Sequence, residues 1–248
     1  MLWKIVSNIM LVLLAISILS VALKIQTIKA EGDVTITINA DGSITPPWGL
    51  IKTVDNITYT FTGNISYPIW NGIVVERSNI VIDGSGYTVQ GNRNGLSVNA
   101  LTTGINITGG LSNVTIRNAD VEGFGFGIYL GLYSSGGTVV GNYVTANING
   151  IWLAGSNGNT ISGNQATANG WGIGLGESFL NTVTGNDVTA NIDYGIVFGA
   201  FSNNNTVSGN SATANGDGIA LGVGSNYNRI SGNDVTANSV GIFEWCFI

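Results

Sequence analysis

Apolar and polar residues alternate in short segments along most of this chain, and similar segments return at a nearly constant interval. Within a segment every second side chain is apolar, and glycine or asparagine marks the ends. A period of two is typical of strands, and no part of the repeat sustains a helical period. The pattern therefore predicts an all-β chain built from many short strands.

Five Gly-Asn pairs mark the repeat. Their asparagines lie 22, 22, 24 and 23 residues apart, at Asn142, Asn164, Asn186, Asn210 and Asn233. A second asparagine follows five residues later in each copy, at Asn147, Asn169, Asn191, Asn215 and Asn238, and a Gly-Ile pair comes next. A unit this small cannot bury its apolar face alone, so it must stack on its neighbours. We therefore expect a right-handed parallel β-helix with coils of about 22–24 residues.

Stacking of the coils predicts which side chains face the core. In residues 160–168, alternation directs Ile161, Ala166 and Ala168 inward and Thr167 outward. Equivalent alanines should then form an inward column: Ala168, Ala190, Ala214 and Ala237. We expect the asparagines to occupy left-handed corners and to join their amides in ladders from coil to coil.

The chain divides into three parts. Residues 1–30 carry a basic residue, Lys4, near their start, continue with an apolar run from Ile5 to Leu23 and end in a small residue, which indicates a signal peptide. That run of 19 residues is nearly long enough to span a bilayer, so an uncleaved N-terminal anchor is the alternative. Residues 31–77 are expected to form an N-terminal cap with the first strands, and residues 78–248 the repeat domain.

Location and charge limit the partners. With either kind of leader, we expect the repeat domain outside the cytoplasmic membrane, secreted or at the cell surface, with membrane contact only through the N-terminal segment. From Glu31 onward, five cationic residues face 14 acidic ones, a net charge of −9. Such a charge disfavours nucleic acid as a partner. The chain has no histidine, and its one cysteine, Cys246, excludes an internal disulfide framework.

Five sequons of the form Asn-x-Ser/Thr occur along the chain. Their acceptors are Asn56, Asn64, Asn106, Asn113 and Asn204. They are candidate glycosylation sites if the host modifies exported proteins, although an Asn- and Thr-rich repeat also produces such sequons by chance.

A family resemblance rests on three features of the sequence. These are the segment Ser78–Gly91 (SNIVIDGSGYTVQG), the segment Gly127–Leu130 (GIYL), and the five coils of the type Asn-Thr-Ile-Ser-Gly-Asn. Over roughly residues 55–245 the chain resembles the NosD-like, pectate-lyase-like family of right-handed parallel β-helices. The resemblance implies the fold more strongly than any activity, because this scaffold hosts lyases, hydrolases, epimerases, adhesins and accessory proteins.

The resemblance also implies chemistries that can be compared with this chain. The NosD name implies an association with copper, which needs His, Cys or Met ligands. Met1 and Met10 lie in the leader and Cys246 stands alone, so we expect no copper site and no resident cofactor. The histidine-containing motifs of polygalacturonase-like and alginate-epimerase-like members are absent. Ca²⁺, which pectate-lyase-like members use, stays open, although no acidic cluster is evident.

Three aspartates are the candidates if the chain is an enzyme. Glycoside hydrolysis uses two carboxylates about 5–10 Å apart, and neighbouring coils lie about 4.8 Å apart. Asp193 and Asp217 stand in the corners before successive Gly-Ile strands, and Asp187 follows a Gly-Asn pair. The alternative is that all three are solvated corner or surface side chains.

Aromatic residues gather at outward positions of the Gly-Ile strands. Alignment of the coils places Tyr129 beside Trp152, and Trp171 beside Tyr194. Exposed aromatic rings flanked by Asn and Asp suit the apolar faces of sugar rings. The alternatives are that these rings cover a sheet face or contact a neighbouring molecule.

Two hypotheses follow. The leading one is a non-catalytic, secreted or surface-attached β-helix that binds glycans or serves as an envelope or matrix component. The rival is a carbohydrate-active enzyme, a polysaccharide lyase or a glycoside hydrolase, on the same scaffold. Self-association through the C-terminal coil is a further expectation, because the last strand is followed by no polar cap. Alternatively, Trp245, Phe247 and Ile248 fold over that end.

Overall fold

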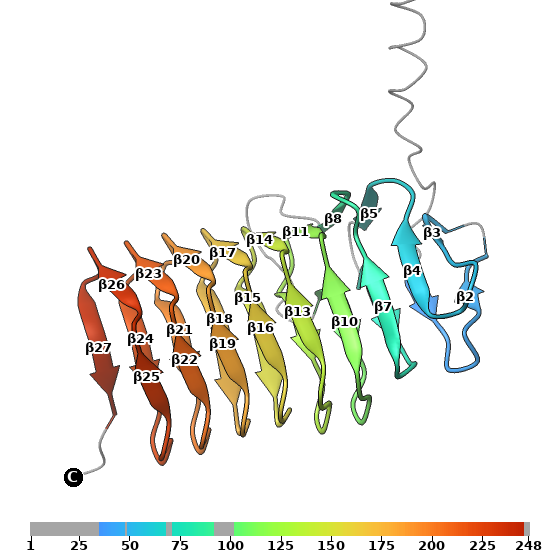
Figure 1. The fold of residues 1–248 in the computed structure, drawn as a ribbon. Helices are drawn as coiled ribbons and strands as arrows, with labels where there is room; N and C mark the ends of the chain where they lie inside the picture. Colours follow the sequence, from blue (N-terminus) through green and yellow to red (C-terminus); the bar gives the residue numbers. More distant parts are fainter. Residues whose placement is uncertain (1–34, 48, 68–70, 92–101, 246–248) are drawn as a thin grey trace, which may run out of the picture.

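The computed structural model describes residues 35–47, 49–67, 71–91 and 102–245, and in these residues all regular secondary structure is β-strand. Three sheets run side by side along one axis (Figure 1). The predicted parallel β-helix is therefore confirmed, with about eight turns. The predicted leader, residues 1–30, lies outside the described residues. Within the described part of the chain, no helix has the length and apolar character needed to cross a membrane.

Strands from successive coils lie next to one another in each sheet. The ten-stranded sheet contains, in spatial order, β2 (Ile44–Thr45), β1 (Ile36–Ile38), β6 (Ile73–Val75), β9 (Thr103–Ile107), β12 (Phe126–Leu130), β15 (Asn149–Ala154), β18 (Trp171–Gly176), β21 (Tyr194–Phe198), β24 (Asp217–Leu221) and β27 (Val240–Glu244). The nine-stranded sheet contains β25 (Arg229–Ser231), β22 (Thr206–Ser208), β19 (Thr182–Thr184), β16 (Thr160–Ser162), β13 (Thr138–Val140), β10 (Val114–Arg117), β7 (Ile80–Asp83), β4 (Thr58–Phe61) and β3 (Ile51–Lys52). The eight-stranded sheet contains β26 (Asp234–Thr236), β23 (Ser211–Thr213), β20 (Asp187–Thr189), β17 (Gln165–Thr167), β14 (Tyr143–Thr145), β11 (Asp120–Glu122), β8 (Thr88–Gly91) and β5 (Ile65–Tyr67).

Each coil contributes one strand to each sheet. From β12 the chain passes to β13, then to β14, and returns to the ten-stranded sheet at β15. Every coil pairs in parallel with the next at equal register, so that Ile128 stands opposite Ile151 and Val139 opposite Ile161. Among the described strands, antiparallel pairing is confined to β1 with β2 and β3 with β4, both within the region expected to form the N-terminal cap.

The core is a set of stacked apolar columns, and the structure corrects one of the predicted columns. Ile161 and Ala166 are fully buried as expected. Ala168 instead lies on the surface with a φ of 53°, and Ala190, Ala214 and Ala237 have the same left-handed backbone. The prediction was wrong because strand alternation stops at the corner. The left-handed residue turns its methyl group outward and brings the next residue, Asn169, into the core.

The predicted asparagine ladders are present, and every member except the last of each ladder is buried. Along the first, each Nδ2 donates to the Oδ1 of the next coil at 2.9–3.0 Å, through Asn142, Asn164, Asn186, Asn210 and Asn233. The second uses Asn147, Asn169, Asn191, Asn215 and Asn238 at 2.9–3.2 Å. A third ladder, at 3.1 Å, was not predicted and runs through Asn159, Asn181, Asn205 and Asn228.

The backbone conformation of the ladder asparagines differs from the prediction. The asparagines of the first two ladders do not have the expected left-handed backbone. The residue before each of them has it instead, a glycine in the first ladder and an alanine in the second, as with Gly163 (φ 60°) and Ala168 (φ 53°). The physical reason is hydrogen bonding. Each Oδ1 receives both the backbone N–H and the Nδ2 of the preceding coil, which requires the amide to point into the core.

The glycine of each Gly-Ile pair is imposed by packing. At Gly172 an added Cβ would lie 2.6 Å from the carbonyl oxygen of Gly195 and would also clash with Cγ1 of Val188. Gly172 and Ile173 therefore both face the interior, and the strand skips one pairing there. This irregularity decides which residues of the ten-stranded sheet reach its outer face.

The last coil leaves apolar side chains uncovered in the described part of the chain. Ile242 is 56% exposed, although Ile219 at the same register in the preceding coil is fully buried. Self-association through this coil stays a prediction.

Replacement of Asn186 by alanine is expected to destabilise the solenoid strongly. The Oδ1 atom accepts two hydrogen bonds from Asn164, and Nδ2 donates to Asn210 and to the carbonyl of Ile161. Because the substitution leaves several buried groups without partners, the free energy of unfolding should fall by about 2–4 kcal/mol. Urea unfolding followed by circular dichroism measures the change.

Thr182→Ala is the matched control, because Thr182 is half-buried on the outer side of the nine-stranded sheet in the same coil. Its effect should stay within about 0.5 kcal/mol. Equal effects of the two substitutions would contradict a special role for the ladder.

Candidate functional site

The outer face of the ten-stranded sheet carries the predicted aromatic residues. In β12 an added Cβ on Gly127 would lie 2.6 Å from Cγ1 of Val144, inside the core, and Ile128 is fully buried. Two successive residues thus face inward, so the residue before the glycine, Phe126, and the residue after the isoleucine, Tyr129, both face outward. The same geometry repeats in β15, β18 and β21 because every coil contains the Gly-Ile pair.

These outward residues form a continuous row, which we call the aromatic ladder. The structure confirms the predicted neighbours, with Tyr129 at the register of Trp152 and Trp171 at that of Tyr194. The ladder consists of Phe126, Tyr129, Trp152, Trp171, Tyr194, Trp245 and Phe243. Its ring centroids are 5.3 Å apart for Phe126–Tyr129, 6.4 Å for Phe126–Trp152, 5.5 Å for Trp152–Trp171, 5.4 Å for Trp171–Tyr194, 5.7 Å for Tyr194–Trp245 and 5.5 Å for Trp245–Phe243.

Three members of the ladder were not among the predicted site residues. Phe126 shares the register column of Trp171 and Tyr194, and that alignment was sufficient to identify it. Trp245 was expected over the open end of the last coil, but its ring packs on Tyr194 and Phe243. Phe243 and Trp245 are two residues apart in an extended segment, so their side chains point to the same face of the sheet. That spacing was the sequence signal for both rings. The other two residues of that prediction, 247 and 248, lie outside the described residues.

Small residues form the floor under the rings. Gly174 stands at the register of Trp152, and a Cβ there would overlap Cε3 and Cζ3 of the indole. The indole of Trp152 therefore lies across the next coil. Further along the column, Val197 and Ala220 are 2% and 0% exposed although they do not belong to the core cluster. The outer face thus has an apolar layer of its own.

Carboxylates border the ladder at its centre. Trp171 donates its Nε1–H to Oδ2 of Asp193 at 3.2 Å. Asp217 stands opposite Tyr194, in the next coil. Burial raises the pKa of the Tyr194 hydroxyl, and the charges of Asp217 and Asp193 raise it further. The two aspartates flank Tyr194, since Asp193 precedes it in the chain and Asp217 stands at its register in the next coil.

The third candidate aspartate lies elsewhere. Asp187 belongs to β20 of the eight-stranded sheet, where it faces Gln165 and Ser211 in the neighbouring coils. The structure brings Asp193 and Asp217 to one edge and leaves Asp187 on a different sheet. Among the described residues, no three His, Cys, Asp or Glu side chains gather as a metal site would require.

The sequons occupy several faces of the molecule. The acceptors Asn56, Asn64, Asn113 and Asn204 are exposed. Asn106 lies on β9 at the register of Tyr129, so a glycan at this position would adjoin the aromatic ladder. Glycosylation of these residues stays a prediction.

The chain resembles known proteins in family and in fold. A family model described as "Periplasmic copper-binding protein (NosD)" matches residues 78–245. A search of the curated proteins found no match. Solved structures similar to the chain include the periplasmic alginate epimerase AlgG, with a TM-score of 0.54 and 21% identity over 75% of this chain and 52% of AlgG.

Two phage proteins share the fold. The Dettilon tailspike protein (gp208) has a TM-score of 0.57 and 19% identity over 73% of this chain and 41% of its own. The enzymatically active domain of tailspike protein 2 from bacteriophage CBA120 has a TM-score of 0.53 and 20% identity over 75% and 34%. The chain thus spans about half the length of AlgG and less of the tailspikes, and at these identities the likeness concerns the fold alone.

Gly174→Ala is expected to displace the indole of Trp152 without disturbing the core. The new methyl group meets a side chain that can rotate away, so the free energy of unfolding should fall by less than about 1 kcal/mol, while tryptophan fluorescence shifts to longer wavelength. Gly172→Ala, two residues earlier, places its methyl group against backbone and should cost about 2–3 kcal/mol. A larger loss at Gly174 than at Gly172 would contradict this assignment of the two faces.

The double substitution Asp193→Asn and Asp217→Asn is expected to lower the pKa of Tyr194, because it removes two charges that disfavour tyrosinate. Burial persists, so the value should stay above the ordinary 10.0. NMR titration of ring-labelled tyrosine measures it, with Tyr194→Phe for assignment and Asp187→Asn as the control without effect. Since the folded-state pKa exceeds the unfolded-state one, the contribution of Tyr194 to stability is present below pH 10 and falls above it.

Proposed function

The chain belongs to the NosD family, and from this premise we propose that it is a non-catalytic β-helix protein that binds glycan chains along its aromatic ladder. The family is described as periplasmic, and we propose a position outside the cytoplasmic membrane, secreted or at the cell surface. A role as an envelope or matrix component is part of the same proposal, because binding to a glycan would hold the protein in such a layer.

The continuity of the ladder is the observation that carries this proposal. Seven rings follow one another at centroid distances of 5.3–6.4 Å on one face of the ten-stranded sheet. Successive coils repeat about every 4.8 Å, a step comparable to the length of one sugar unit. Aromatic rings offer apolar faces to the C–H faces of sugars, and Asn149, Asp193 and Asp217 supply polar atoms beside them for sugar hydroxyls.

Copper binding is not part of the proposal, because the donors of this chain do not fit copper. Copper sites in proteins are built from imidazole, thiolate and thioether groups. The sequence has no histidine, two methionines and one cysteine. The methionines, Met1 and Met10, and Cys246 lie outside the described residues. For Ca²⁺ the described part of the chain supplies no cluster of three acidic side chains.

A carbohydrate-active enzyme remains the rival proposal. It is supported by the position of Asp193 and Asp217 beside the rings and by the alginate epimerase among proteins of the same fold. Hydrolysis of a glycosidic bond uses one carboxyl group as an acid and another as a base or nucleophile. Asp187, the third candidate, would act on a different sheet from the ladder.

Binding of soluble polysaccharides tests the proposed function. On a glycan array the purified protein should bind at least one polysaccharide, and Trp152→Ala or Trp171→Ala should weaken that binding about 10-fold or more, since each stacked ring contributes roughly 1–2 kcal/mol. Retention of full affinity by both variants would exclude the ladder as the site.

Tyr143→Ala is the matched control, because Tyr143 is an aromatic residue that is 41% exposed on the eight-stranded sheet and lies outside the ladder. Its removal should leave binding unchanged. Incubation with the same polysaccharides separates the two proposals. Formation of shorter or unsaturated products that stops with Asp217→Asn would establish the enzyme.

A further inference from the structure

We propose that the glycan of the aromatic ladder is free of acidic groups, and is built from neutral or amine-bearing sugars and not from uronates. This inference rests on the proposed function and names the chemical class of its ligand. The observation behind it is the distribution of charge around the rings.

Carboxylates adjoin the ladder directly. Asp193 accepts the hydrogen bond of the Trp171 indole at 3.2 Å, and Asp217 stands at the register of Tyr194. Glu244, at the end of β27, stands at the register of Leu221, which packs against the core, so it does not belong to this outer face. Negative charge thus lies next to the central rings.

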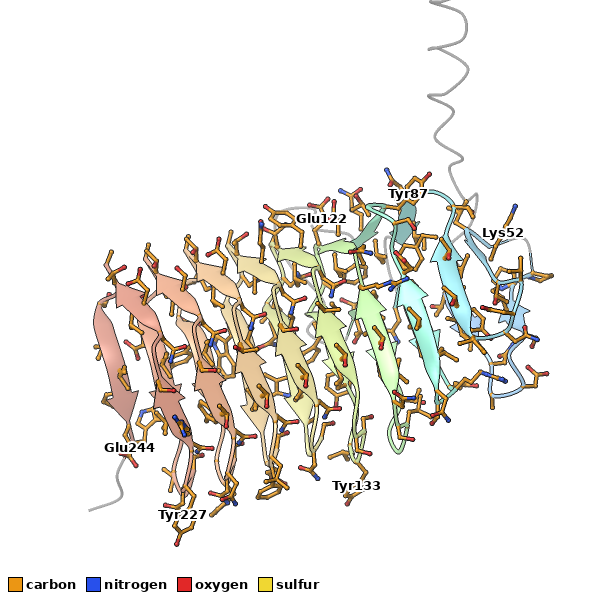
Figure 2. All side chains as sticks on the ribbon, in the orientation of Figure 1. Lys52, Tyr87, Glu122, Tyr133, Tyr227 and Glu244 are labelled. Atoms are coloured by element: carbon orange, nitrogen blue, oxygen red, sulfur yellow. The ribbon has the colours of Figure 1, made fainter. Side chains whose placement is uncertain are left out.

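Among the described residues, no compensating cation lies on this face. The described cationic side chains are Lys52, Arg77, Arg117 and Arg229, and none of them belongs to a strand of the ten-stranded sheet. Arg117 is paired with Asp83 at 2.8 Å, and Arg77 donates to the carbonyl of Ala40. Lys52 lies at the opposite end of the solenoid from Glu244 (Figure 2).

The regular spacing of the rings makes these carboxylates discriminate between acidic and neutral glycans. A polyuronate carries one carboxylate on every sugar, so a chain bound along the row must bring several negative charges past Asp193 and Asp217. Like charges about 4–6 Å apart repel by roughly 1 kcal/mol in water and by several times more near a protein surface. A neutral sugar avoids this repulsion, and its hydroxyls donate to the same carboxylates. Protonated amino sugars gain attraction. Alginate, the substrate named for AlgG, is a polyuronate and falls in the class that this face should reject.

Matched hexasaccharides test the inference. Three pairs differ only at the C6 group of each sugar: hexamers of mannose and mannuronate, of glucose and glucuronate, and of galactose and galacturonate. Isothermal titration at low salt should find at least one neutral hexamer bound, with its uronate partner at least about 10-fold weaker. The double variant Asp193→Asn with Asp217→Asn should reduce that ratio, and added salt should do the same by screening. A glucosamine hexamer should bind the unmodified protein at least as well as the glucose hexamer.

Each outcome decides a separate point. Equal or tighter binding of a uronate hexamer overturns the inference and leaves the glycan-binding function standing. A ratio that survives the double variant and high salt excludes charge as the cause and also overturns it. Absence of binding by all the hexamers, together with a negative polysaccharide array, overturns the proposed function itself. Circular dichroism of the double variant verifies that its fold is retained.

Discussion

The buried asparagine amide is the interaction on which the rest of this structure depends. Its oxygen accepts two N–H groups from the preceding coil, and its nitrogen donates to the next coil and to backbone carbonyls. Within the described residues, every buried polar side-chain atom has a hydrogen-bond partner. A shift of one residue between coils would break all these bonds at once and would also turn the apolar side chains of the shifted coil outward. The ladders thus fix the same register as the apolar columns, and the apolar columns supply most of the burial.

The aromatic ladder is a consequence of that register. Because successive coils align residue for residue, the backbone pairing alone places an outward ring of one coil beside an outward ring of the next. The Gly-Ile pair adds a second condition, since its two inward residues turn the positions on both sides outward. Rigid backbone on one side and small residues such as Gly174 on the other hold the rings in place. A site built in this way needs little reorganisation when a ligand binds.

The repeat predicted the fold, the two asparagine ladders and four members of the aromatic ladder, because period and register are properties of the sequence itself. Errors arose at the corners, where the backbone leaves the extended conformation. Ala168 was assigned to the core by alternation, but a left-handed φ reverses the direction of its side chain. The corners of neighbouring coils also differ in length, since three residues separate Asn191 from Gly195 and two separate Asn215 from Gly218. Asp193 and Asp217 therefore do not share a register position. Corner geometry depends on tertiary hydrogen bonds, which a sequence pattern does not contain.

The equality of the coils has a consequence for how such a chain can change. One coil makes the same hydrogen bonds to its predecessor as to its successor. A segment from one Gly-Asn pair to the next can therefore be replaced by another such segment. The spacings of 22, 24 and 23 residues show that the segments need not be equal in length. Duplication of a gene segment that encodes one coil would lengthen the solenoid by one coil and leave both interfaces intact, and deletion would shorten it by one coil. The length of surface presented to a polymer can therefore be inherited in whole units. In most globular domains an insertion of that size would interrupt the core.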